Sequence, residues 1–133
     1  MRHDEQWARE RFAGARVARL ATVSADAVPR IVPIVFALVG EKILTAVDHK
    51  PKSTTRLRRL EDIAANPAVS LLVDAYDDDW SQLWWARADG VARVHATRDL
   101  DPLVAKYADY REQPPTGAVI VIEVSRWSGW SAT

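Results

Sequence analysis

Residues 47–67 concentrate positive charge at one point of the chain. Five cations follow one another there without an intervening acidic residue: Lys50, Lys52, Arg56, Arg58 and Arg59. The residues before them are typical of a strand and residues 54–65 of a helix, so the cations surround a strand-to-helix turn. Because free backbone N–H groups and the helix dipole attract anions, and added cations oppose that dipole, the pattern predicts a phosphate site. An ordinary charged helix surface is the alternative interpretation.

A helical wheel of residues 54–65 separates these cations by direction. One face is apolar and is expected to be buried: Leu57, Leu60 and Ala64, with Ile63 at its flank. Arg56 lies beside that flank in the first turn and can present its guanidinium to the turn. Arg58 points away and has Asp62 four residues on, which predicts a solvated surface pair.

The rest of the chain offers little side-chain catalysis. It has no glycine-rich phosphate loop, no serine in a nucleophile elbow and no paired histidines at metal-ligand spacing. His49 lies at the basic turn and is either a ligand there or a surface turn residue. The carboxylates of residues 77–79 are adjacent and point apart on an extended chain, so we expect an exposed loop and no metal site. A phosphate site without a catalytic constellation is typical of a protein whose bound cofactor carries the reaction.

Length and composition indicate one domain without a global charge. The 133 residues are 48% apolar, which is enough for one core, and residues 1–133 are expected to form a single domain. A net charge of zero argues against binding to nucleic acid or anionic lipid. Cysteine is absent, which excludes disulfides and fits a reducing compartment. Because no segment reads as a signal peptide or a membrane span, we expect a cytoplasmic protein.

Apolar and alternating runs predict a mainly β fold. Strands are expected at residues 16–23, 28–38, 42–47, 68–75, 83–95 and 118–127, and helices at residues 3–13, 54–65 and 99–110. Pro29 and Pro33 cannot donate ladder hydrogen bonds, so strand 28–38 must be bulged or lie at an edge where a ligand can approach. The pair Asp89 and Gly90 indicates a bulge in strand 83–95. These elements predict a six-stranded antiparallel barrel-like sheet with helical decorations.

Several stretches, taken in order, resemble a known family. They are VPRIVPIVF at 28–36, KPK at 50–52 before the basic helix, ANP at 65–67, VSLLVD at 69–74 and GVA at 90–92. This order resembles the split β-barrel flavin-binding proteins related to pyridoxamine 5′-phosphate oxidase, and within them the actinobacterial branch that uses the deazaflavin coenzyme F420. The resemblance covers nearly the whole chain. It implies a split β-barrel and a homodimer with the cofactor site at the subunit interface.

The resemblance also implies which residues bind the cofactor. The phosphate would lie at the turn with Lys50, Lys52, Ser53, Thr54 and Arg56, preceded by Asp48 and His49, and the ring along Val32, Pro33 and Ile34. Trp80 and Ser81 match positions that contact the cofactor in similar proteins. Many relatives carry a cation where this chain has Thr54, and either Arg56 or Arg59 takes its place. The vitamin-binding residues of the oxidase have no match near the C-terminus, so pyridoxamine oxidation is not expected.

Four hypotheses follow for the function. The leading one is an F420-dependent reductase that passes hydride from reduced F420 to a small electrophilic organic substrate, the protein supplying orientation and a dry pocket. The second keeps the fold and replaces F420 with FMN. The third is a carrier that binds the cofactor without turnover, and the fourth is single-strand nucleic-acid binding, against which the zero net charge argues.

Overall fold

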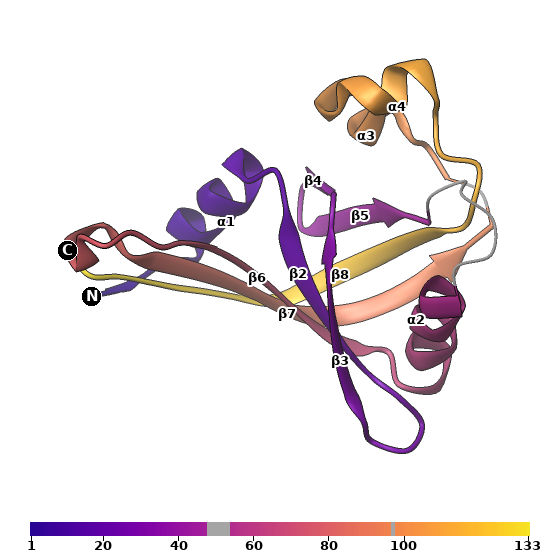
Figure 1. Ribbon diagram of the computed structural model, residues 1–133, viewed down its shortest axis with the longest axis horizontal. Helices are drawn as coiled ribbons and strands as arrows, with labels where there is room; N and C mark the ends of the chain where they lie inside the picture. The colour runs from indigo at the N-terminus through magenta and orange to yellow at the C-terminus, as the bar shows by residue number, and fades with distance from the viewer. Residues whose placement is uncertain (48–53, 97) are drawn as a thin grey trace.

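A computed structural model describes residues 1–47, 54–96 and 98–133, except for the side chains of residues 54–57. The strands are β1 (Arg2–His3), β2 (Ala18–Val23), β3 (Pro29–Ile34), β4 (Ala37–Val39), β5 (Lys42–Ala46), β6 (Ala68–Ala75), β7 (Trp84–His95) and β8 (Val119–Ser131). The helices are α1 (Glu5–Gly14), α2 (Thr54–Ala65), the 3₁₀-helix η1 (Trp80–Gln82), α3 (Asp101–Lys106) and α4 (Ala108–Glu112). In Figure 1 the long strands β6, β7 and β8 run across the molecule, with α1 towards one end and α2, α3 and α4 towards the other.

The strands form one antiparallel sheet in the order β3-β2-β6-β7-β8-β5-β4, with β1 paired to β8. The two edge strands, β3 and β4, are consecutive in the chain and only Val35 and Phe36 separate them. The chain therefore passes directly from one edge of the sheet to the other, which curls the sheet into the expected split barrel. β3 is an edge strand, as Pro29 and Pro33 predicted.

The same passage corrects the predicted strand count. We expected six strands, whereas the described residues form eight. The predicted strand 28–38 is two strands, because residues before Val35 pair with β2 and residues after Phe36 pair with β5. The other addition is the two-residue strand β1. β8 also runs past the predicted end at residue 127 to Ser131, because β1 and β7 both pair with its last residues.

The core forms between α1 and the inner face of the sheet. Alternate residues of β2 are buried, which is the period of a strand with one face in the core. Phe12 of α1 is fully buried and makes edge-to-face contacts with Phe36 and Trp127, at centroid distances of 5.9 and 5.4 Å. α1 is therefore held by large apolar side chains at the point where β3 passes into β4.

A bulge bends the longest hairpin. β7 pairs with β8 over its whole length, with a register shift between Asp89 and Gly90. This confirms the bulge that the sequence predicted at this pair. β7 therefore joins two parts of the sheet, because β6 pairs with one of its edges and β8 with the other.

The predicted helix 99–110 is instead two short helices. α3 and α4 are separated by Tyr107, whose backbone is extended with φ −118° and ψ 120°. The Tyr107 hydroxyl accepts a hydrogen bond from the Phe36 N–H at 3.1 Å, and it lies 2.9 Å from the carbonyl oxygens of Phe36 and Arg16. The prediction of a single helix is wrong because these hydrogen bonds, which satisfy buried backbone groups, hold Tyr107 in a non-helical conformation.

Helix α2 has the predicted bounds, residues 54–65, and its predicted apolar face is confirmed in part, since Leu60 packs against the core. Asp62 and Ile63 are buried and Ala64 is exposed. The Asp62 carboxylate lies 3.0 Å from Nε of Arg30 on β3 and accepts a hydrogen bond from the Thr22 hydroxyl of β2 at 3.2 Å. The predicted surface pair of Arg58 with Asp62 is therefore wrong, because Asp62 faces the sheet.

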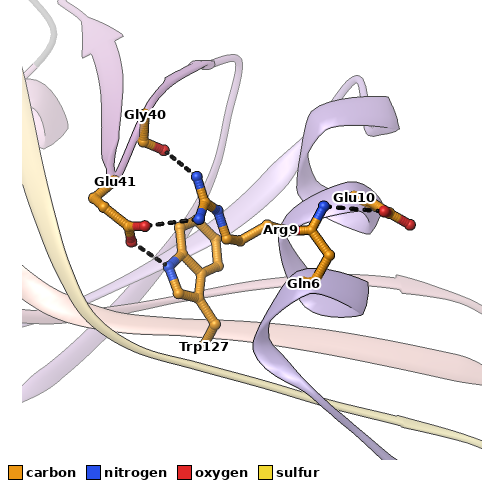
Figure 2. A network of polar contacts seen from close by, with 6 residues as sticks. All are labelled: Gln6, Arg9, Glu10, Gly40, Glu41 and Trp127. Carbon is orange, nitrogen blue, oxygen red and sulfur yellow. Dashed lines mark hydrogen bonds and ion pairs between the residues drawn. The ribbon is translucent and has the colours of Figure 1, made fainter.

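A polar cluster fastens α1 to the turn between β4 and β5 (Figure 2). The Arg9 guanidinium lies 2.7 Å from the Glu41 carboxylate and donates to the Gly40 carbonyl at 3.3 Å. The other Glu41 oxygen accepts a hydrogen bond from the Trp127 indole N–H at 3.0 Å. Glu41 thus joins α1, the β4–β5 turn and β8 through one carboxylate.

Replacing Glu41 with alanine is expected to lower the free energy of unfolding by about 1 kcal/mol, because a largely exposed ion pair is weak but the indole N–H also loses its acceptor. Chemical denaturation measures the change. Glu112→Ala, which removes an exposed glutamate from α4, is the matched control and should change stability by less than about 0.5 kcal/mol. Equal effects of the two substitutions would show that the cluster contributes nothing.

In the part of the chain that the structure describes, none of the helices is both long enough and apolar enough to span a bilayer.

Candidate functional site

Two segments that the sequence assigned to the cofactor meet at one small cavity. It has a volume of about 140 Å³ and lies where the end of β3, the end of β5, α2 and α4 come together. Pro33 and Ile34 were expected along the ring and Arg59 at the phosphate, and all three line it. The full lining is Pro33, Ile34, Val35, Thr45, Ala46, Arg59 and Tyr110.

Strand geometry explains the wall of this cavity on the β3 side. Ile34 is buried, whereas Pro33 is exposed on the opposite face of the strand. Pro33 has no N–H to offer a further strand, so this part of the edge stays open to another molecule. The Thr45 hydroxyl of β5 donates to the Val35 carbonyl at 2.9 Å and so fixes the backbone where the chain leaves β3.

Helix α2 supplies the positive charge. Arg59 is half-buried on α2 and faces the cavity. Asp62, one turn further on, is held by Arg30 and Thr22, so α2 is fixed to the β2–β3 hairpin by an ion pair and a hydrogen bond. Because Arg59 brings a guanidinium to this end of the cavity, we expect the cavity to favour an anion there.

Several predicted site residues fall outside the described part of the chain. These are Asp48, His49, Lys50, Lys52 and Ser53. Thr54 and Arg56 belong to the first turn of α2, but their side chains are likewise outside the description. Val32 is described and half-buried, and it packs against the core cluster instead of lining the cavity. Val32 shares its strand face with Ile34, but it lies two residues further from the end of β3, where the cavity is.

Trp80 and Ser81 lie at the opposite end of the molecule. They form η1 at the tip between β6 and β7, near the C-terminus (Figure 1). The cavity lies near the other end of β7, because His95 pairs with Val119, which pairs with the cavity residue Ala46. The twelve residues of β7 span roughly 35 Å at the rise of a β-strand. The side chain of Trp80 is 68% exposed. At the same tip, hydrogen bonds from the Ser81 side chain and backbone lower the pKa of Asp79. One chain therefore does not bring these residues to the cavity.

The structure adds residues that the sequence did not single out. Tyr110 lines the cavity together with Val35, Thr45 and Ala46. Val35 and Tyr110 also line a second cavity, of about 330 Å³, with Arg16, Tyr107, Ala108 and Asp109. The tyrosines at 107 and 110 stand three residues apart, a spacing typical of one helix face, which was the only sequence signal for them.

Two cations lie over aromatic rings at or next to this second cavity. The Lys106 ammonium lies 3.9 Å from the Phe36 ring centroid, and the Arg16 guanidinium lies 4.8 Å from that of Tyr107. Burial, together with the positive charge of Arg16, lowers the pKa of Lys106 to about 8. Burial also raises the pKa of Tyr107, which keeps its hydroxyl protonated as a hydrogen-bond donor.

The family model described as pyridoxamine 5′-phosphate oxidase matches residues 5–131 of the chain. A search of curated proteins found no match. Among solved structures, the chain is similar to an FAD binding protein from Mycobacterium smegmatis, with a TM-score of 0.68, 17% identity and coverage of 98% of each chain. It is also similar to an FAD-binding protein from Mesorhizobium loti, with a TM-score of 0.68, 18% identity and coverage of 97% of this chain and 95% of that one. At these identities the two structures bear on the fold alone.

Proposed function

Because the chain belongs to the pyridoxamine 5′-phosphate oxidase family, whose members are generally oxidoreductases, we propose that it is a flavin-binding oxidoreductase that uses FMN. Its reaction would be hydride transfer between the flavin ring and a small electrophilic organic molecule. The observation that carries the proposal is the cavity at which Pro33 and Ile34 meet Arg59. The names of the two FAD-binding relatives support a flavin over a deazaflavin.

The residues present fit such a cofactor. Pro33, Ile34 and Val35 give one side of the cavity an apolar surface beside an open strand edge, along which a planar ring would lie. The cavity itself, of about 140 Å³, is smaller than the roughly 300–1,000 Å³ of small-molecule pockets, so most of the cofactor would lie outside it. Arg59 would bind phosphate together with Lys50 and Lys52 from the basic turn. When bound, FMN would supply the redox chemistry, and this chain would orient it and exclude water.

A second copy of the chain completes the proposed site. Trp80 and Ser81 are too far from the cavity of their own chain, and the exposed indole of Trp80 is available to another molecule. In a homodimer, η1 of one subunit would cover the ring bound by the other. Analytical ultracentrifugation that showed only monomer at micromolar concentration would remove this part of the proposal.

Coenzyme F420 is the second candidate cofactor. It shares with FMN a planar ring and a phosphate group, so the same cavity and cations would accept it, and the sequence resemblance favours it. Even without Arg58, which points away, the cations at the turn exceed what a single phosphate requires, which also fits a cofactor with more negative charge. A carrier that holds either cofactor without turnover has the same binding site and differs only in reactivity.

Titration of the purified chain with FMN, FAD and F420 separates these candidates. We expect FMN fluorescence to be quenched with saturation at micromolar or lower concentration. Tighter binding of F420 than of FMN would transfer the proposal to the deazaflavin, and binding of none of the three would overturn it. If the reduced cofactor binds but is not reoxidised by a panel of enones, quinones and nitroaromatics, the carrier hypothesis replaces the enzyme.

Arg59→Gln and Lys52→Ala are each expected to weaken cofactor binding by about 1–3 kcal/mol, which is the cost of one charge-assisted contact. Fluorescence titration measures the affinity, and circular dichroism verifies that each variant folds. The matched controls are Arg93→Gln on the exposed side of β7 and Lys42→Ala on β5, which should leave affinity unchanged. Wild-type affinity in both site variants would show that the cavity does not receive the phosphate.

A further inference from the structure

A third and larger hollow shares one lining residue with the second cavity. It has a volume of about 560 Å³ and lies between α1, β2, β6 and β7. Arg16 lines both this hollow and the 330 Å³ cavity, which in turn shares Val35 and Tyr110 with the cofactor cavity.

Three arginines line the hollow, Arg11, Arg16 and Arg19. Arg16 donates a hydrogen bond to the Lys106 carbonyl at 3.0 Å and stacks over Tyr107. Arg11 stacks over Trp7 at 4.5 Å. None of the three forms an ion pair with a carboxylate within the described ranges 1–47, 54–96 and 98–133. The charge of these arginines is therefore not balanced by an ion pair within the described residues.

Two carboxylates, those of Glu10 and Asp74, also line the hollow and reduce this charge. Glu10 accepts a hydrogen bond from Gln6 at 3.1 Å on the exposed side of α1, and Asp74 is exposed near the end of β6. Three cations against two anions leave a positive balance, and the ammonium of Lys106 adds to it from beside Arg16. The field of the hollow thus favours a ligand with one negative group.

An aromatic wall accompanies these cations. Trp84 is half-buried, lines the hollow and meets Trp7 edge-to-face at a centroid distance of 6.1 Å. The Arg11 guanidinium lies 5.7 Å from the Trp84 ring centroid, so an apolar surface and a cation stand side by side. Such a pair suits a planar ligand that carries a carboxylate, since the ring can stack and the carboxylate can accept from a guanidinium.

We propose that this hollow is a second binding site that takes the carboxylate end of an aromatic acid, with Arg19 and Arg11 as the anion-binding residues and Trp84 as the stacking surface. Trp84 begins β7 beside η1, so this site lies towards the opposite end of the chain from the cofactor cavity, and the inference does not depend on the proposed function. The binding itself requires no cofactor, so it can be tested separately.

The test is a titration of the full chain with 2-naphthoate and with its neutral analogue 2-naphthamide, measured by isothermal titration calorimetry. We expect 2-naphthoate to bind and 2-naphthamide to bind at least about fivefold more weakly, because the amide lacks the charge that the guanidinium groups recognise. Raising the salt concentration should weaken only the carboxylate.

Matched variants assign the binding to this hollow. Arg19→Gln is expected to weaken 2-naphthoate binding about fivefold, whereas Asp74→Asn, which removes a negative group from the same hollow, should strengthen it by a similar factor. Arg93→Gln is the control on an exposed strand position outside the hollow and should have no effect. Opposite effects of the Arg19 and Asp74 variants are not expected from a general loss of structure.

The outcomes separate this inference from the proposed function. Three results would overturn this binding site, whatever the flavin titration gives. They are equal affinity for 2-naphthoate and 2-naphthamide, no binding of 2-naphthoate, and a wild-type response in both the Arg19 and Asp74 variants. Binding of 2-naphthoate with the expected variant effects, in a chain that binds none of FMN, FAD or F420, would keep the anion site and remove the oxidoreductase.

Discussion

Replacing Gly90 with alanine is expected to lower the free energy of unfolding by at least about 3 kcal/mol, at or beyond the usual range for overpacking. A Cβ atom at this position would overlap the backbone carbonyl oxygen of Glu123, and it would lie 2.9 Å from the carbonyl carbon and 3.0 Å from Cα of Val124. All three atoms belong to the backbone of β8, so no side chain can rotate away. Relief would require β7 and β8 to separate at the bulge between Asp89 and Gly90.

Urea denaturation of the Gly90→Ala chain measures this loss. Gly14→Ala is the matched control, because a Cβ at the last residue of α1 would meet nothing within 4 Å, and it should be neutral or slightly stabilising. Similar stabilities of the two variants would mean that the β7–β8 bulge can widen without cost. Because the two sides of the sheet are joined along β7, we expect the Gly90 variant also to bind flavin more weakly.

Replacing Asp62 with alanine is expected to cost about 3 kcal/mol of folding free energy. This is the lower end of the range for removing one partner of a buried ion pair, because the side chain of Arg30 is 39% exposed and stays partly hydrated. The Thr22 hydroxyl also loses the carboxylate to which it donates. Since these contacts hold α2 against β2 and β3, cofactor affinity should fall as well, through displacement of Arg59.

Two further variants test the cause. Asp62→Asn keeps a group that can accept from Thr22 and should cost less than Asp62→Ala, whereas Asp78→Ala removes an exposed carboxylate and should cost less than about 0.5 kcal/mol. If Asp62→Ala proves as stable as Asp78→Ala, the ion pair does not anchor α2. If it is unstable yet binds flavin normally once folded, Asp62 supports the fold without positioning the site.

Local patterns in the sequence predicted most elements. The bounds of α2 and β6 match the predicted residues 54–65 and 68–75, and the bulge lies at the predicted Asp89 and Gly90. Each of these signals lies within a short window: an apolar period of 3.6 or 2 residues, a helix stop at Asn66 and Pro67, or an Asp-Gly pair inside a strand pattern, which indicates a bulge. The edge position of β3 could also be predicted, because Pro29 and Pro33 lack the N–H that an inner strand must donate.

Other features depended on contacts between distant residues. The strand predicted at 28–38 divides because Phe36 carries the chain between the two sheet edges, and the helix predicted at 99–110 breaks because Tyr107 bonds to that same Phe36 backbone. Asp62 turned inward because Arg30 and Thr22, more than thirty residues earlier, provide its partners. No window of a dozen residues contains both sides of these contacts.

Because periodicity, proline and charge spacing act locally, the order of residues was enough to predict a mainly β protein whose charge gathers at one strand-to-helix turn. It was not enough to predict that Arg59 shares a cavity with Pro33, Ile34 and Tyr110, or that Trp80 lies far from it. The reason is that a site is made by strand register and by the passage of β3 into β4. Those are set by the packing of the whole core, to which every distant segment contributes.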